Sequence, residues 1–253
     1  MRTPAGAAAA AALAWCGCSG GDEAGGDSQP RLVVSAAASM SEALRDCSPG
    51  FPDARVRLSF AGSDELAAQV RRGVKPDVFA AANTKLPQAL HAEGRLGRPL
   101  RFATNELVLA ARVGSRVRSL AAAAGPGVKL AIGSASVPVG SYTRELLGRL
   151  PPGERHGILA NVRTSEPDVK GVVGKLTQGA VDAAFVYRSD AHAAGAGLRA
   201  IGLPARLRPR VVYAAGVVKG APEPALGRRY LRGLASGRCA RTLRRAGFGP
   251  PPR

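Results

Sequence analysis

Aromatic residues, histidines and cysteines are scarce in this chain of 253 residues. Phe, Trp and Tyr make up 4% of it, and it contains three histidines and four cysteines. His91, His156 and His192 lack the spacing of metal ligands and have no nearby carboxylate in the sequence to form a catalytic pair. The chain also contains no Gly-x-Ser-x-Gly turn and no cysteine pair typical of redox work. These absences disfavour an enzyme.

Acidic residues are also few, with 18 Asp and Glu against 36 Lys and Arg, a formal net charge of +18. Such an excess can indicate a nucleic-acid partner. The basic residues are spread along the chain, however, and the densest cluster, Arg238 to Arg245, has no interleaved aromatics. Zinc-ligand spacing, an RNA-binding aromatic motif and a glycine-rich phosphate loop are all missing. We therefore expect no nucleic-acid partner, only loose attraction to an acidic cell surface.

Residues 1–30 have the composition of an export signal followed by a flexible linker. The apolar run 5–15 is too short to span a bilayer as a permanent helix. Cys16 and Cys18 follow it, as in a bacterial lipoprotein signal, where such a cysteine is lipidated. Cys16 has the bulky Trp15 before it, whereas Cys18 follows a glycine but has poorer residues upstream. Both stay candidates for a lipid anchor to the cell membrane, and plain secretion is the alternative.

Export implies an oxidising environment, so the two other cysteines are candidates for a disulfide. Cys47 ends the first helix expected after the linker, and Cys239 lies in the last. If the two ends of the chain meet in one lobe, these cysteines can pair and close a very long loop. Two unpaired thiols are the alternative, because sequence supplies no distance between them.

After residue 30, strand-like apolar runs alternate with amphipathic segments. This alternation predicts an α/β fold with mostly parallel strands. Strands are expected at 31–35, 54–59, 77–81, 102–111, 128–132, 183–187 and 211–218, and helices at 40–46, 64–72, 85–93, 141–149, 168–178 and 225–246. The long runs 102–111 and 211–218 bracket a middle section of domain size. We therefore expect two lobes, one formed by 31–108 plus 214–253 and the other by 109–213, with a ligand cleft between them.

Two serines stand where an expected strand meets an expected helix. Ser39 follows the first strand and Ser63 the second. A serine there can cap free backbone N–H groups, and it can also offer its hydroxyl to an anion. Spacing alone leaves both interpretations open. Two such junctions on neighbouring parallel strands place two hydroxyls and two positive helix ends within reach of one small oxyanion.

Six segments carry a family resemblance. They are VSAAASM (34–40), SFAGSDELA (59–67), PDVFA (76–80), FATN (102–105), VPVGSY (137–142) and FVYRSD (185–190). In this order they resemble the molybdate-binding proteins of bacterial ABC importers, over residues 31–249. The resemblance implies a two-lobed, type II-like periplasmic-binding-protein fold with an anion cleft between the lobes.

The resemblance also implies a set of ligand-binding residues. Hydroxyls and amides of Ser39 and Ser63, the amides of Val139 and Val169, and the hydroxyl of Tyr187 would hold molybdenum as molybdate, with no separate cofactor. Tungstate is nearly the same size and is an equally expected ligand. No carboxylate belongs to this set, which disfavours a protonated phosphate.

The resemblance further implies an exported monomer that delivers its anion to a membrane permease. Two alternatives remain from the residues themselves. One is a carrier of another tetrahedral oxyanion, sulfate or phosphate, in the same fold. A serine-dependent hydrolase with Ser39 as nucleophile is the other, although no base accompanies it.

Overall fold

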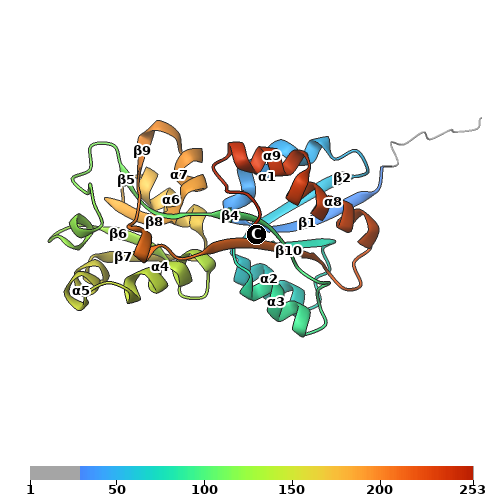
Figure 1. Ribbon diagram of the computed structural model, residues 1–253, viewed down its shortest axis with the longest axis horizontal. Helices are drawn as coiled ribbons and strands as arrows, with labels where there is room; N and C mark the ends of the chain where they lie inside the picture. The colour runs from blue at the N-terminus through green and yellow to red at the C-terminus, as the bar shows by residue number, and fades with distance from the viewer. Residues whose placement is uncertain (1–28, 253) are drawn as a thin grey trace, which may run out of the picture.

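Two five-stranded sheets form the two ends of an elongated molecule (Figure 1). The first has the strand order β2 (Arg55–Ala61), β1 (Arg31–Ala37), β3 (Val78–Ala81), β10 (Val211–Val217) and β4 (Leu100–Asn105). The second has the order β7 (Val162–Glu166), β6 (Leu130–Gly133), β8 (Ala183–Tyr187), β5 (Leu107–Arg112) and β9 (Leu198–Ile201). We call the parts built on these sheets the first and the second lobe.

This computed structural model describes residues 29–252. Cys16 and Cys18 lie outside the described residues, with nearly all of the expected export signal and linker. None of the helices in the described part has the length and apolar character that a membrane crossing requires.

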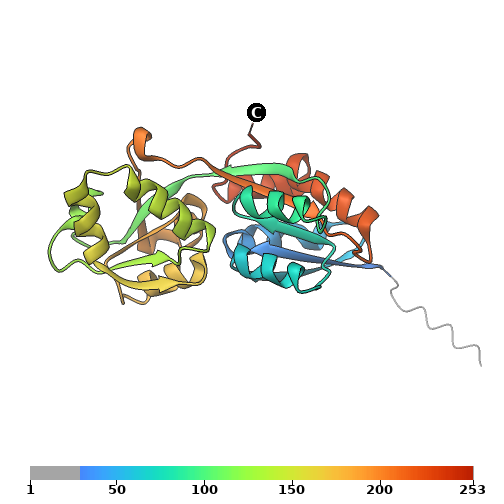
Figure 2. The same ribbon diagram turned by 90° about the horizontal axis from the view of Figure 1, so that it is seen from below.

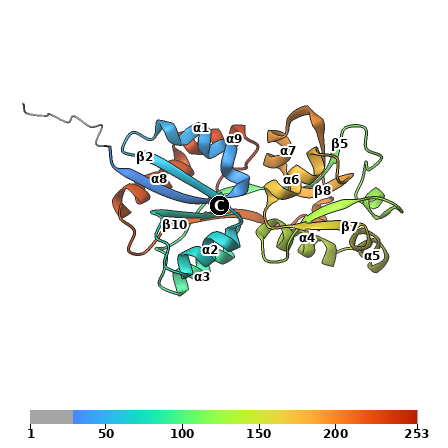
Figure 3. The same ribbon diagram turned by 180° about the vertical axis from the view of Figure 1, so that it is seen from behind.

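Helices cover both faces of each sheet (Figures 1 and 3). In the first lobe, α1 (Ser41–Cys47), α8 (Pro224–Ser236) and α9 (Arg238–Arg245) lie on one face, and α2 (Ser63–Arg71) and α3 (Lys85–Ala92) on the other. In the second, α6 (Val169–Thr177) and α7 (Arg188–Ala193) lie opposite α4 (Pro138–Gly148) and α5 (Pro152–Ala160). Short 3-10 turns are η1 (Ala38–Met40), η2 (Ser48–Gly50), η3 (Ala121–Ala124), η4 (Gly195–Gly197) and η5 (Ala205–Leu207). Strands covered on both faces are apolar throughout, so every residue of β3 and β8 is buried.

The two sheets share one topology. In the first, β1 pairs in parallel with β2 and β3, while β10 runs antiparallel to both β3 and β4. In the second, β6 pairs in parallel with β7 and β8, while β5 runs antiparallel to both β8 and β9. Each sheet therefore has four strands in one direction and a single reversed strand. The predicted α/β fold with mostly parallel strands is confirmed.

The prediction of a single strand at 102–111 is wrong. β4 ends at Asn105 in the first sheet, and β5 begins at Leu107 in the second. The chain changes sheets at Glu106, whose N–H donates to Asn105 Oδ1 at 2.8 Å instead of to a neighbouring strand. It returns through residues 202–210 to β10, and Figure 2 shows both connections on one side of the molecule. The lobe limits expected at 108/109 and 213/214 lie close to these changes of sheet and stay predictions.

The prediction of a single helix at 225–246 is also wrong. α8 ends at Ser236 and α9 begins at Arg238, because Gly237 between them has an extended backbone with φ −92° and ψ −152°. The sequence reasoning also missed α5, α7, β7 and β9. Two prolines suggest a break at the start of α5, yet Pro152 at the first helical position is compatible with a helix. The edge strand β7 is only partly buried and mostly polar, so it lacks an apolar run.

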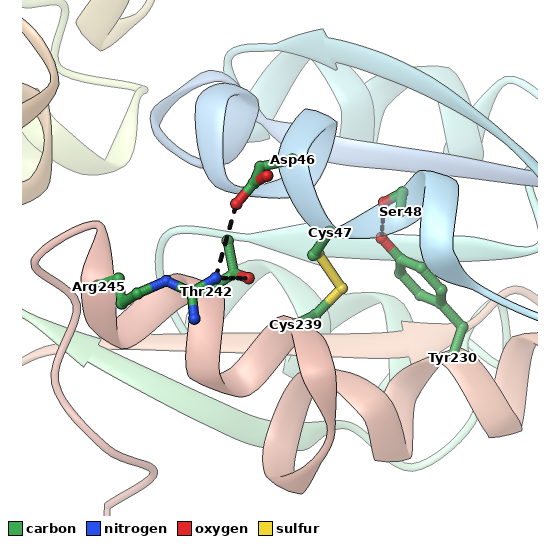
Figure 4. The surroundings of a disulfide bond; sticks show 7 residues. All are labelled: Asp46, Cys47, Ser48, Tyr230, Cys239, Thr242 and Arg245. Atoms are coloured by element: carbon green, nitrogen blue, oxygen red, sulfur yellow. Dashed lines mark hydrogen bonds and ion pairs between the residues drawn. A yellow bond between two sulfur atoms is a disulfide. The ribbon is translucent and has the colours of Figure 1, made fainter.

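The two ends of the chain meet in the first lobe. There a disulfide joins Cys47, the last residue of α1, to Cys239 in α9 across 192 residues of sequence (Figure 4). Beside it, the hydroxyls of Ser48 and Tyr230 lie 2.8 Å apart in a buried hydrogen bond. These contacts attach the C-terminal helices to the beginning of the fold, so the first lobe closes only after the second has been synthesised.

Replacing both Cys47 and Cys239 by serine is expected to lower the free energy of unfolding by about 3–5 kcal/mol, because the cross-link restricts a very long loop in the unfolded chain. Denaturant unfolding of the variant and of the wild-type protein, both starting at Gln29 and both without reductant, measures the difference. Thiol titration of the denatured, unreduced wild-type protein should find neither cysteine free. Two reactive thiols per molecule would contradict the disulfide.

Candidate functional site

A small cavity with a volume of about 20 Å³ lies where the two lobes meet. It is lined by Ala37, Ala38, Ser39, Ala61, Gly62, Ser63, Ala82, Val137, Pro138, Val139, Asp168, Val169 and Tyr187. A site of this size suits one small ion and is too small for a sugar, a nucleotide or a peptide.

The lining comes from three strand ends of each sheet. In the first lobe these are the residues that follow β1, β2 and β3, and in the second those that follow β6 and β7 and the end of β8. The carboxyl ends of parallel strands share one edge of a sheet, and this edge is the usual ligand-binding edge of α/β folds. Because the two sheets turn these edges toward each other, the turns of both lobes meet at one cavity.

All five residues expected to bind the ligand line this cavity. Ser39 lies in η1 and Ser63 is the first residue of α2, whereas Val139 and Val169 lie in the first turns of α4 and α6. Tyr187 is the last residue of β8. Each is 4% exposed or less, so a bound ion would be removed from bulk water. Their role in binding stays a prediction.

Backbone N–H groups at three helix ends are available to the cavity. In each helix, the first backbone N–H that donates to a carbonyl four residues earlier belongs to Leu66 in α2, Ser141 in α4 and Val172 in α6. The amides before them, which include those of Ser63, Val139 and Val169, have no acceptor within their own helices. Such helix ends carry partial positive charge and bind anions.

Neither Ser39 nor Ser63 caps its helix through the side chain. Ser63 Oγ accepts a hydrogen bond from the N–H of Ala82 at 3.1 Å, which leaves its own proton free to be donated. Ser39 Oγ lies 2.8 Å from the hydroxyl of Tyr213. The interpretation of these serines as ordinary caps is therefore wrong, because their hydroxyls are bonded to other elements of the first lobe.

The hydroxyl of Tyr187 is fully buried and has no hydrogen-bond partner among the described residues. Burial raises the pKa of Tyr187 well above its usual value, so the hydroxyl keeps its proton at neutral pH. A buried donor without an acceptor is costly. It is the clearest sign in the cavity that a ligand with acceptor oxygens belongs there.

One acidic residue lines the cavity, although sequence reasoning expected none. Asp168 is the N-cap of α6, and its Oδ1 accepts the N–H of Gly171 at 2.9 Å. The Asp-Val-Lys-Gly order at the start of an expected helix is a cap signal that could have identified it. The expected discrimination against protonated phosphate therefore cannot rest on the absence of a carboxylate.

A charged trio bridges the lobes next to the cavity. Lys170 Nζ in α6 lies 2.7 Å from Glu42 Oε2 in α1 and 3.3 Å from Asp190 Oδ1 in α7. Burial raises the pKa of Asp190 to about 7, although Lys170 acts in the opposite direction. Burial also opposes ionisation of Glu42, but the hydrogen bond and the charge of Lys170, together with hydrogen bonds from the Glu42 backbone and Ser41, outweigh it and lower the pKa of that carboxyl. Among the described residues, no lysine, arginine or histidine lines the cavity itself.

The family of the chain follows from a match over most of its length. The family described as bacterial extracellular solute-binding protein matches residues 32–249. The chain belongs to this family. These solute-binding proteins are extracytoplasmic and are not enzymes, so the hydrolase alternative is wrong.

Relatives and solved structures agree with this assignment. The molybdate-binding protein ModA of Mycobacterium tuberculosis is 34% identical over 227 residues, which cover 87% of this chain and 85% of that protein. The structure of the Azotobacter vinelandii periplasmic molybdate-binding protein matches with a TM-score of 0.76 at 20% identity, covering 87% of this chain and 100% of that one. The resemblance and the periplasmic-binding-protein fold are thus confirmed.

The fold alone does not identify the anion. The sulfate-binding protein SubI of Mycobacterium tuberculosis also has a TM-score of 0.76, at 16% identity and with 87% of each chain covered. Proteins named for different oxyanions thus share this architecture. The choice of anion has to be argued from the cavity and from the sequence relatives.

Asp190 provides a test of the charged trio. Its folded pKa of about 7 exceeds the unfolded value of 3.8, so the folded state holds a proton that the unfolded state releases. The free energy of unfolding of the wild-type protein, relative to Asp190→Asn, should therefore fall as the pH rises from about 5 to about 7. Thermal or denaturant unfolding of both proteins across this range measures the difference.

Glu42→Gln is the matched comparison. The pKa of Glu42 is lowered on folding, so its stabilising contribution is present at neutral pH and is lost only on acidification. The two variants should therefore differ in the sign of their pH dependence. Parallel stability profiles of Asp190→Asn and the wild-type protein between pH 5 and pH 8 would contradict the raised pKa.

Proposed function

We propose that this solute-binding protein captures molybdate, or tungstate, outside the cytoplasm and delivers it as a monomer to the permease of an ABC importer. The site comprises the hydroxyls of Ser39, Ser63 and Tyr187 and the backbone amides of Val139 and Val169, with amides of the two serines. Lipid anchoring through Cys16 or Cys18 would keep the protein near that permease.

The buried, unpartnered hydroxyl of Tyr187 is the observation that supports this function most strongly. Tyr187 lines a cavity of single-ion size, and the other donors there include the hydroxyl of Ser63, whose proton is free, and helix amides without helical acceptors. The one carboxylate of the lining, that of Asp168, is engaged as a helix cap. An anion with four acceptor oxygens would satisfy these donors from several sides. Neutral donors suffice, because helix N-termini and hydrogen bonds to a charged acceptor stabilise a desolvated dianion.

The sequence relatives favour molybdate among such anions. ModA of Mycobacterium tuberculosis, at 34% identity, is named for molybdate binding. Sulfate has the same charge and shape but is smaller, so its hydrogen bonds would be stretched in a cage sized for molybdate. Tungstate and molybdate are nearly equal in size, so the cavity is expected to bind both.

Isothermal titration calorimetry on the protein starting at Gln29 is expected to show a single site for molybdate. Ser39→Ala and Ser63→Ala should each weaken binding by about tenfold or more, because each removes a hydrogen bond to a charged acceptor. Ser48→Ala is the matched control, since Ser48 is also a buried, hydrogen-bonded serine of the first lobe but lies outside the cavity. Unchanged affinity in both site variants would contradict the assignment.

Competition between oxyanions tests the choice of ligand. Molybdate and tungstate should displace each other at similar concentrations, whereas sulfate and phosphate should require a large excess. Thermal-shift measurements with the four anions give the same ranking in a faster form. Equal binding of sulfate and molybdate would overturn the specificity, and preferential binding of phosphate would point to Asp168 as an acceptor for its proton.

A further inference from the structure

A second tyrosine is bonded to the site without lining the cavity. Tyr213 lies in β10, fully buried, at the point where the pairing of β10 with β4 shifts register. Its hydroxyl is 2.8 Å from Ser39 Oγ, although the two residues are 174 positions apart in sequence. No motif that carries the family resemblance contains it.

Asn105 favours one direction for this hydrogen bond. Its Oδ1 accepts the N–H of Glu106 at 2.8 Å, which fixes the orientation of the amide. Its Nδ2 can therefore only donate, and it reaches Ser189 Oγ at 2.8 Å and the hydroxyl oxygen of Tyr213 at 3.4 Å. Because Asn105 can only donate, Ser39 Oγ is the one acceptor that the described residues offer to the Tyr213 proton, which favours Tyr213 as the donor to Ser39.

Burial keeps that proton in place, because it raises the pKa of Tyr213 well above its usual value. Ser39 Oγ then acts as the acceptor in its contact with Tyr213 and retains its own proton for another partner. Ser39 lines the cavity, so the remaining proton is available to a ligand there.

We propose that Tyr213, oriented by Asn105, is a positioning residue of the anion site: it donates to Ser39 Oγ and so presents the Ser39 proton to the bound oxyanion. This inference rests on the proposed function. It adds that Tyr213, a residue of β10, makes Ser39 a hydrogen-bond donor to the ligand.

Packing holds Tyr213 in the position that this role requires. Its ring meets those of Phe102 and Phe248 edge-on, with centroids 6.2 and 5.2 Å away. The ring of Tyr187 meets it in the same way at 5.9 Å. Tyr213 therefore contacts a site residue of each lobe, Ser39 through its hydroxyl and Tyr187 through its ring. A hydroxyl fixed in this way loses little further freedom when the ligand binds.

Tyr213→Phe removes the hydroxyl and keeps the ring. Calorimetry should show molybdate binding about fivefold to tenfold weaker than in the wild-type protein, because Ser39 can still donate but is no longer held in the donor orientation. In a double-mutant cycle, Tyr213→Phe should cost almost nothing once Ser39 is alanine. A merely structural role would weaken binding equally in both backgrounds.

Tyr230→Phe is the matched control. Tyr230 is also a buried tyrosine of the first lobe with its hydroxyl 2.8 Å from a serine, Ser48, but the pair lies beside the disulfide rather than the cavity (Figure 4). Loss of the Tyr230 hydroxyl should lower thermal stability about as much as loss of the Tyr213 hydroxyl does. It should leave the affinity for molybdate unchanged. Equal effects of the two variants on affinity would overturn the inference.

A spectroscopic measurement needs no variant of the network. The chain has four tyrosines. With ¹³C at the Cζ atom of each, saturating molybdate should shift the resonances of Tyr187 and Tyr213 and leave that of Tyr230 in place. An unmoved Tyr213 resonance, or full affinity in Tyr213→Phe, overturns this inference alone. A wild-type protein that binds no molybdate overturns the proposed function, and this inference with it.

Discussion

The convergence of strand ends from two sheets is the constraint on which the rest of this structure depends. Parallel strands place their carboxyl ends, and the helix N-termini that follow them, at one edge of a sheet. Two sheets of the same topology turn these edges toward each other, and each contributes three strand ends to a single cavity. Gly62 permits this approach, since a Cβ there would lie 2.6 Å from the carbonyl oxygen of Pro167 in the other lobe.

This arrangement separates neutral donors from charged groups. Inside the cavity the donors are hydroxyls and amides, and the carboxylate of Asp168 is engaged as a helix cap. The cation Lys170 follows directly after Val169 but is directed to carboxylates of both lobes, Glu42 and Asp190. A formal charge buried beside a dianion would hold it tightly, whereas a carrier must also release it. For the proposed dianion, neutral donors with the nearby cation ion-paired outside the cavity would allow both capture and release.

The parts of this structure that local sequence determines were predictable. Ser39, Ser63, Val139 and Tyr187 each lie in a short segment with its own strand-to-helix pattern, and the α/β alternation is visible throughout. Contacts between distant segments were not predictable in the same way. Tyr213 reaches Ser39 across 174 positions, and no pattern near either residue indicates the other. The change of sheet at Glu106 and the break between helices at Gly237 were not predicted, because the apolar pattern continues through the first position and the helical pattern through the second.

Anomalous diffraction at the molybdenum absorption edge, from crystals of the protein grown with molybdate, locates the bound anion directly. We expect one strong anomalous peak inside the cavity, with oxygens around it within hydrogen-bond distance of the Ser39, Ser63 and Tyr187 hydroxyls and the Val139 and Val169 amides. A cavity without a molybdenum peak, or a molybdenum held instead by arginine or lysine side chains on the surface, would contradict the proposed site.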